Sequence, residues 1–492
     1  METVIIAKKD DLLTFDNNIT RWQNNMLNNV SLVKNEITVV NKYKNSIFDN
    51  GTVIGRTNVD LTCEKVTKLA ESFGSVLPVG STVYVSRDYH KSSRMLKRAF
   101  LGGLLSTGIN VFDLKLTSPA VMCFNLAHND HIVAGVHFEQ SFESHSCTQI
   151  SFFTNEGLNI DISKEKAIER IFLRENFLRV NYTDIGEIYE NGYLDNSYVK
   201  KFLESLNVLA IKHKKFHIAI DLLYGSAASI FPAILNELDV DSVILNAYFN
   251  DKKLTNISNQ LLKSKRELSE IIVGMKLDLG LLIYPDFKTL DIVCNNGIIL
   301  ERYIALLVFL ELLAHEKDKK RVLLPVWTPD FLDNRFQNLR IDRAKITNLK
   351  SADLQRYDFI ATTSGNYVCS EFGFHYDSLF ASMKLIEMLS RESKFISEIA
   401  MSFEPFYYFE TKIACENRLK GKMMRKLLED SLDKKNSNGD GIKIWMNEKD
   451  WIVIIPDQNS DTLRLYIQAS TEKEGQKILK EYSKKIRHWA EE

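Results

Sequence analysis

The chain has 492 residues, more than one hydrophobic core usually organises, so three to four domains are expected. Its 63 basic and 64 acidic residues leave a formal charge of −1, which argues against a nucleic-acid or anionic-membrane partner held by bulk electrostatics. The apolar run at residues 303–310 stops at Glu311, short of the roughly 20 residues that a membrane span needs. An N-terminus without a signal-peptide core and six scattered cysteines predict a cytoplasmic protein with reduced thiols.

The first 45 residues form a polar, Asn-rich N-terminal extension without sustained periodicity. Within it we predict a short helix over residues 19–28 and a strand over residues 36–40. We place the first domain boundary after residue 45, where the apolar patterning begins.

A strand–helix–strand rhythm follows the extension. Thr62 is the expected N-cap of a helix, because its hydroxyl can accept a hydrogen bond from a free N–H of the first turn. The predicted elements are a helix over 66–73, a strand over 82–86, a helix over 92–107 and a strand over 110–114. Such βαβ units build parallel or mixed sheets with helices on their faces.

The same rhythm restarts twice before the chain changes character. The second unit has strands over 216–220, 242–245 and 280–283 and a helix over 227–238; the third has helices over 304–315 and 378–390 and strands over 321–325 and 357–361. The last part has strands over 441–445, 451–455 and 462–468 and a helix over 472–486. We therefore predict three α/β domains, at residues 46–185, 186–297 and 298–400, and a C-terminal α+β domain at residues 401–492.

Three stretches carry a family resemblance. They occur in this order: Asn58-Val59-Asp60-Leu61-Thr62, Ser86-Arg87-Asp88 with Ser92-Ser93, and Tyr224-Gly225-Ser226-Ala227 with Pro232. The chain resembles the α-D-phosphohexomutases, the phosphoglucomutase and phosphomannomutase family, from roughly residue 50 to its end. The resemblance implies the four-domain phosphohexomutase architecture: three α/β domains with mixed sheets and a C-terminal α+β domain.

Other stretches are closer to a subgroup of that family. Residues 93–111 and 421–425, and the pair Pro456-Asp457, resemble the mutase-like C-terminal half of two-part mannose-1-phosphate guanylyltransferases, which are sugar-nucleotide pyrophosphorylases. The Gly-rich phosphate loop of their nucleotidyltransferase half has no counterpart in the first 50 residues. This likeness implies a sugar phosphate or nucleotide sugar as ligand, and it makes a sugar-nucleotide pyrophosphorylase a candidate partner.

The family's phosphoserine loop reads Gly-Ile-Met-Ile-Thr-Ala-Ser-His-Asn-Pro and matches residues 135–144. Ser141 falls on the nucleophile position, so the hydroxyl is retained. Glu139 replaces the threonine, and Phe142 and Glu143 replace the histidine and asparagine. Two carboxylates beside a phosphorylated serine are expected to repel its negative charge.

The family's metal loop, Asp-Gly-Asp-x-Asp-Arg, directs three carboxylates at one Mg²⁺, a cation that prefers several oxygen ligands. The matching positions are Tyr284, Asp286 and Lys288, with Thr289 in place of the arginine. Only Asp286 remains as a metal ligand, so we predict that no metal cofactor binds. Lys288 either partly mimics the cation or forms a surface ion pair with Asp286.

The family's sugar loop, Gly-Glu-x-Ser-Gly-His, matches residues 361–366. Ser364 and Gly365 are retained, and Thr362 replaces the glutamate that grips the sugar hydroxyls. These three residues are the candidate sugar contacts.

The family's phosphate loop, Arg-Pro-Ser-Gly-Thr-Glu-Pro-x-Leu-Arg, matches residues 455–464. Arg464 is retained, whereas the first arginine has become Ile455 and Asp457 adds a carboxylate that opposes a phosphate. Arg464 and Arg87 are the candidate phosphate-binding residues.

These four altered loops leave three hypotheses. The first is a non-catalytic relative of sugar-phosphate metabolism, a pseudoenzyme that binds a sugar phosphate and regulates or scaffolds other enzymes. The second is an active phosphoglucomutase or phosphomannomutase, an intramolecular phosphotransferase that works through Ser141. The third is a non-catalytic subunit of a sugar-nucleotide pyrophosphorylase. By family the chain is a phosphotransferase, and the loops predict an impaired or inactive one.

Overall fold

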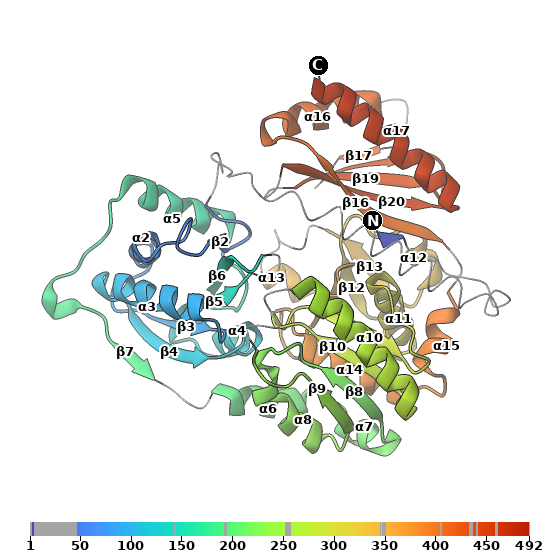
Figure 1. Cartoon of the computed structure of the whole chain (residues 1–492), viewed down its shortest axis with the longest axis horizontal. Helices are drawn as coiled ribbons and strands as arrows, with labels where there is room; N and C mark the ends of the chain where they lie inside the picture. The colour runs from blue at the N-terminus through green and yellow to red at the C-terminus, as the bar shows by residue number, and fades with distance from the viewer. Residues whose placement is uncertain are drawn as a thin grey trace. The chain divides into compact units, whose positions relative to one another are not determined.

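The computed structural model describes residues 2–3, 47–141, 144–190, 194–250, 257–344, 346, 351–403, 406–431, 436–438, 441–457 and 461–491 (Figure 1). The predicted helix over 19–28 and strand over 36–40 lie outside these residues. The chain divides into two compact units: residues 46–325 with 336–400, and residues 401–492 with 326–335 and the N-terminal strand β1 (Glu2–Thr3). No helix in the described part of the chain is long and apolar enough to cross a bilayer.

The first sheet has six strands in the order β2-β6-β5-β3-β4-β7. Its strands are β2 (Thr52–Arg56), β3 (Thr82–Arg87), β4 (Asn110–Leu116), β5 (Ile132–Gln140), β6 (Cys147–Thr154) and β7 (Ile188–Glu190). The helices are α2 (Cys63–Gly74), α3 (Lys91–Ser106), α4 (Pro119–Ala127) and α5 (Ile162–Arg174). Apolar residues of α2, α3 and α5 pack on one face of the sheet, and those of α4 pack on the other.

The second sheet has the order β11-β10-β8-β9, in which β8, β9 and β10 are parallel and β11 is antiparallel. Its strands are β8 (His217–Asp221), β9 (Asp241–Leu245), β10 (Leu279–Ile283) and β11 (Leu290–Cys294). Its helices are α6 (Leu194–Glu204), α7 (Val208–Lys214), α8 (Phe231–Glu237) and α10 (Ile257–Met275). Burial of Leu268 and Ile272 fixes α10 against the sheet, with the β10–β11 hairpin beside it.

The third sheet has the order β13-β12-β14-β15 and is likewise mixed. Its strands are β12 (Arg321–Leu324), β13 (Arg340–Arg343), β14 (Phe359–Ala361) and β15 (Tyr367–Cys369). Its helices are α11 (Arg302–Ala314), α13 (Ser351–Leu354), α14 (Ser378–Ser390) and α15 (Ile396–Met401). Nearly every residue of α14 is buried, and the helix packs on α11 as well as on α7 and on β10 of the second sheet.

The C-terminal unit is an antiparallel sheet in the order β1-β16-β20-β19-β18-β17, with two helices on its apolar face (Figure 1). Its remaining strands are β16 (Tyr407–Ala414), β17 (Asn436–Asn438), β18 (Ile442–Trp445), β19 (Trp451–Pro456) and β20 (Thr462–Ala469). The helices are α16 (Asn417–Asp430), α17 (Glu472–Glu491) and the short α12 (Phe331–Arg335) from the inserted segment. Three mixed α/β sheets and this module confirm the predicted fold class.

Most predicted elements are confirmed within a residue or two, including the Thr62 cap, whose hydroxyl accepts from the Lys65 N–H at 3.3 Å. The helix predicted over 227–238 is wrong at its start. A 3-10 turn over Ser226–Ser229 comes first, and α8 begins at Phe231. Pro232 explains the break, because proline lacks an N–H and is accepted only in the first turn of a helix.

Candidate functional site

The candidate site is built on the carboxyl ends of β3 and β5, which are parallel neighbours in the first sheet. The chain runs from β3 to β4 on one side and from β4 to β5 on the other, so the strand order reverses at β3. Ligand crevices of α/β sheets form at such switch points. Asp88 connects the two strand ends, because its carboxylate accepts from the Gln140 N–H at 2.7 Å and from the His90 ring at 2.8 Å.

The Asp88 carboxyl group that connects the two strand ends is ionised. Burial opposes its ionisation, but the hydrogen bonds from His90 and the Gln140 N–H outweigh burial and hold the pKa of the carboxyl below its usual range. Arg87, the predicted phosphate-binding residue, ends β3 and donates from Nη1 to the Asp88 carbonyl oxygen at 2.7 Å. Burial, followed by the charge of Arg94, lowers the pKa of Arg87. An anion near Arg87 would relieve this excess of positive charge.

Ser141, the predicted nucleophile, comes directly after β5. Its N–H donates to the Cys147 carbonyl oxygen at 2.9 Å, which fixes the backbone against the start of β6. The residue is 5% exposed, and its hydroxyl has no hydrogen-bond partner among the described residues. Phe142 and Glu143 lie outside the described residues. The Ser141 hydroxyl, at the switch point of the sheet, is therefore not hydrogen-bonded to any described residue.

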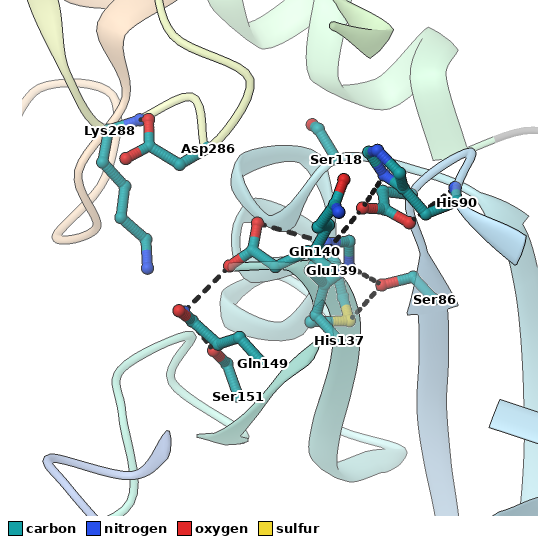
Figure 2. A network of polar contacts seen from close by, with 12 residues as sticks. Ser86, His90, Ser118, His137, Glu139, Gln140, Gln149, Ser151, Asp286 and Lys288 are labelled. Atoms are coloured by element: carbon teal, nitrogen blue, oxygen red, sulfur yellow. Dashed lines mark hydrogen bonds and ion pairs between the residues drawn. The ribbon is translucent and has the colours of Figure 1, made fainter. Parts of the chain in front are cut away.

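A network of buried polar side chains runs along β5, next to the strand end that precedes Ser141; Figure 2 shows the network. The Ser86 hydroxyl and His137 Nδ1 are hydrogen-bonded at 2.8 Å, and His137 Nε2 lies 3.8 Å from a Glu139 carboxylate oxygen. Gln149 Nε2 on β6 donates to the other Glu139 oxygen at 3.0 Å. These four side chains face the same side of the sheet and form one network that ends at Glu139.

Burial sets the protonation of this network. It raises the pKa of Glu139 to about 8, although the nearby charge of Lys288 acts in the opposite direction. It also lowers the pKa of His137 to about 3. Both side chains are therefore mostly neutral at pH 7. In its neutral form Glu139 does not repel a phosphate on Ser141 and can donate a hydrogen bond to a phosphoryl oxygen. The repulsion expected from Glu143 concerns a residue outside the described ones.

The loop that matches the family's metal loop follows β10. The Tyr284 phenol points inward, 4% exposed, and donates to Asp291 at 2.8 Å while it accepts from Arg302 at 2.7 Å. The predicted surface ion pair between Lys288 and Asp286 is not formed, because no side-chain oxygen of Asp286 lies within 4.0 Å of the ammonium nitrogen. Figure 2 shows the Lys288 ammonium pointing away from Asp286 and toward Glu139.

These residues do not fit the divalent cation that the family resemblance implies. One oxygen of Asp286 accepts from the Lys288 and Thr289 N–H groups at 2.9 and 3.2 Å, and the other accepts from the Thr289 hydroxyl at 3.2 Å. Asp286 thus caps its own turn, and Tyr284 is engaged elsewhere. The described residues contain no group of three His, Cys, Asp or Glu side chains arranged for a metal.

The predicted sugar loop follows β14 and is bound to the loop after β10. Leu290 donates its N–H to the Gly365 carbonyl oxygen at 3.0 Å, and the Thr289 hydroxyl donates to the Asn366 side chain at 3.2 Å. Gly365 has φ +82°, and a Cβ there would meet the Leu290 carbonyl oxygen at 2.9 Å, so glycine is required. The Thr362 hydroxyl accepts the Ser364 N–H at 3.2 Å, and Ser364 itself is exposed.

The predicted phosphate loop belongs to the C-terminal unit and is considered by itself. Arg464 Nε donates to the buried Asp457 carboxylate at 2.8 Å. Burial disfavours the Arg464 charge, but this hydrogen bond raises its pKa above the ordinary value. Lys420 Nζ donates to the Asp457 carbonyl oxygen as well. The Asp457 carboxylate thus pairs with the Arg464 guanidinium, and the Asp457 carbonyl oxygen accepts from Lys420, so both cations already have partners within this loop.

Sequence reasoning identified Ser141 and weighed Lys288, but it missed that Glu139 on β5 faces Lys288 in the loop after β10. It also missed the Thr289–Asn366 connection. The loops follow directly after β5, β10 and β14 in the sequence, so their residues lie at strand ends. That position was the only sequence feature that could have indicated these contacts. The facing of two strand ends that are distant in the sequence is a tertiary property that no local pattern encodes.

Comparison with known proteins gives a family-model match over residues 45–179, to the phosphoglucomutase/phosphomannomutase alpha/beta/alpha domain I. A protein of Pyrococcus furiosus named "Probable phosphoglucosamine mutase" is 26% identical over 434 residues, covering 86% of this chain and 93% of that protein. A Thermococcus kodakarensis protein named phosphoglucomutase/phosphomannomutase is 23% identical, with coverage of 88% and 96%.

Two solved structures share the fold. A phosphoglucomutase/phosphomannomutase family protein from Burkholderia thailandensis superposes with a TM-score of 0.73 at 14% identity, covering 89% of this chain and 96% of that chain. The Paramecium phosphoglucomutase parafusin, in an open form, superposes with a TM-score of 0.67 at 12% identity, with coverage of 90% and 95%. At these identities the likeness establishes the shared architecture alone.

Proposed function

We propose that this chain, whose family-model match and relatives support the α-D-phosphohexomutase superfamily, moves a phosphoryl group between two oxygens of a phosphorylated hexose or hexosamine. The observation that carries the proposal is the uncommitted Ser141 hydroxyl at the β3–β5 switch point, two residues from a carboxyl group that faces a lysine. The relatives named as mutases favour this catalytic function over the non-catalytic interpretation. We place the protein in the cytoplasm, in keeping with its six free cysteines.

The proposed reaction passes through a phosphoserine. A hexose bisphosphate first phosphorylates Ser141: a P–O bond to that sugar breaks, a P–O bond to Ser141 Oγ forms, and the serine proton passes to the sugar oxygen left behind. The phosphoryl group then moves to the free hydroxyl of a bound sugar monophosphate: the P–O bond to Ser141 breaks, a P–O bond to the sugar forms, and the sugar hydroxyl proton passes to Ser141 Oγ through a general base. The other phosphoryl group of the resulting bisphosphate moves to Ser141 by the reverse of this step, so the net change is the position of one phosphate.

Glu139 is the group that we assign to proton exchange. Its pKa of about 8 keeps both protonation states available near neutral pH, which suits a general acid–base group. Gln149 and His137 hold the carboxyl group from below, so it keeps one orientation while it faces the loop after β10. The exposed Ser364 is the residue that we assign to the sugar.

The test is a mutase assay with glucosamine, glucose and mannose phosphates, with a hexose bisphosphate added as activator. Ser141→Ala should lower turnover at least 1,000-fold and remove the phosphoserine from the intact-mass spectrum, because it deletes the acceptor oxygen (order of magnitude). Ser144→Ala, in the same loop, is the matched control and should keep both. Absence of turnover and of phosphoserine in the unchanged protein with every one of these sugars would refute the proposal.

A second candidate function is binding of a sugar phosphate without turnover, as the pseudoenzyme hypothesis holds. The internal Asp457–Arg464 pair argues against turnover of the family's kind, because Asp457 competes with the phosphate for the arginine; binding would then depend on the residues at the ends of β3, β5 and β10. Ligand-induced thermal stabilisation without turnover would identify this case. The third hypothesis, a subunit of a sugar-nucleotide pyrophosphorylase, has only the resemblance of residues 93–111 and 421–425 in its favour, and co-elution with such an enzyme tests it.

A further inference from the structure

In the loop after β10, two of the three positions that match the family's metal ligands have side chains that stabilise the fold itself. Tyr284 is held inward by hydrogen bonds with Asp291 and Arg302. Its phenol oxygen is therefore engaged within the fold. Both carboxylate oxygens of Asp286 accept hydrogen bonds from its own turn, one from backbone N–H groups and the other from the Thr289 hydroxyl.

The third position, Lys288, behaves differently. It is half-buried, and its ammonium forms no ion pair or hydrogen bond with any described residue. Figure 2 shows its side chain extended toward Glu139, at the end of β5. The Lys288 charge acts at that strand end, because it lowers the pKa of both Glu139 and His137. Glu139 does not neutralise the ammonium, since burial keeps that carboxyl mostly protonated at pH 7.

The backbone of this loop is firmly held, which gives the ammonium a defined origin. Phe287 is fully buried with φ +56°, a left-handed conformation that the packed core imposes. Thr289 is hydrogen-bonded to Asp286 and to Asn366. A fixed loop that projects one uncompensated cation across to the carboxyl end of β5 is a binding feature for an anion.

We infer that Lys288 is the cation of this site: its ammonium binds the phosphoryl group directly, and phosphate recognition here needs no divalent metal. The inference deepens the proposed function and rests on the same site. A lysine supplies one compact positive charge with three donors, which suits a phosphate oxygen. The neutral Glu139 carboxyl complements it by donating a hydrogen bond instead of adding a negative charge.

The test measures binding separately from turnover. Inorganic phosphate and glucose 6-phosphate are titrated calorimetrically into the full-length protein, once in EDTA and once in excess Mg²⁺. Equal affinity in both buffers is expected. Lys288→Gln should weaken binding roughly 10- to 100-fold, as loss of a charged hydrogen bond does, and Mg²⁺ should not restore it. Lys288→Arg should retain most of the affinity.

Lys276→Gln is the matched control, because Lys276 is an exposed lysine of the same domain, and it should bind like the unchanged protein. Binding that requires Mg²⁺, binding that Lys288→Gln leaves unchanged, or no binding of either probe would overturn the inference. Metal-free, Lys288-dependent binding without turnover would uphold the inference while the proposed function fails. Turnover that needs Mg²⁺ would do the reverse.

Discussion

At the scale of single residues, Glu139 and His137 titrate in opposite directions. Glu139 ionises near pH 4.5 when exposed and near 8 when folded, so its contribution to stability is complete below 4.5 and is lost as pH rises to about 8. His137 gains a proton near 6.5 when exposed and near 3 when folded, so its contribution is lost as pH falls from 6.5 to 3. The two slopes oppose each other between 4.5 and 6.5, and only that of Glu139 remains above 6.5.

In the unchanged protein the free energy of unfolding should fall as the pH rises above 6.5, because Glu139 ionises. Glu139→Gln should abolish this decrease. Between pH 6.5 and 8 the unchanged protein should lose about 2 kcal/mol of unfolding free energy through Glu139, since one pKa unit corresponds to about 1.4 kcal/mol. Urea unfolding of the larger unit at both pH values measures the difference. Glu156→Gln, an exposed glutamate in the turn after β6, should keep the original slope. A slope that Glu139→Gln leaves unchanged would mean that the buried carboxyl is ionised.

At the scale of elements, the loops after β10 and β14 form one connected edge. Thr289 joins them: its hydroxyl lies 3.2 Å both from Asp286 in its own turn and from Asn366 in the loop after β14, and Thr289 is 9% exposed. Two short loops that would otherwise order separately are thereby ordered together. This preorganisation lowers the entropy cost of closing them around a ligand.

Thr289→Val keeps the shape of the side chain and removes the hydroxyl. We expect a loss of about 1–2 kcal/mol in local stability, because the two acceptors lose a shared donor. Hydrogen exchange should become faster in both loops, at residues 286–290 and at 362–366. Thr183→Val, at an exposed position far along the chain, should leave both loops unchanged. Faster exchange in one loop only would show that the two order independently.

The elements that the sequence predicted well are those whose signal is local. β3 and α14 were predicted nearly to the residue, since an apolar run or a helical period is contained within each. The β10–β11 hairpin was missed at β11, and α10 was missed entirely, because burial of Leu268 and Ile272 depends on a sheet formed elsewhere. The pairing of Asp457 with Arg464 follows from the β19–β20 register, which no motif alignment contains. The predicted site residues share this limit, since their partners come from other elements.

At the scale of the whole molecule, the smaller unit borrows a segment from within the sequence of the larger one. Residues 326–335 leave β12 and contribute to the C-terminal unit. Asp330 accepts from Lys443 Nζ at 2.6 Å and from Trp445 Nε1 at 3.2 Å, and Trp327 stacks on Tyr466 with ring centroids 4.8 Å apart. Three separate segments of the chain therefore make up this unit: residues 1–45, 326–335 and 401–492.

Asp330→Ala should lower the stability of the C-terminal unit by about 1–3 kcal/mol, because the largely buried Lys443 ammonium loses its carboxylate. Differential scanning calorimetry should show one transition moving down while that of the larger unit stays in place. Glu448→Gln, an exposed change in the same unit, is the control. A downward shift of both transitions would mean that the two units unfold as one.

The borrowed segment also has a consequence for synthesis on the ribosome. Asp330 and Lys443 are 113 residues apart in sequence, so at about 5–20 residues per second the segment waits on the order of 6–20 s for its partner. During that interval the preceding domains can complete their own sheets, while Trp327 and Phe331 remain without the aromatic neighbours they contact in the finished protein. The nascent chain thus carries a timed, exposed apolar segment, the kind of surface that molecular chaperones recognise.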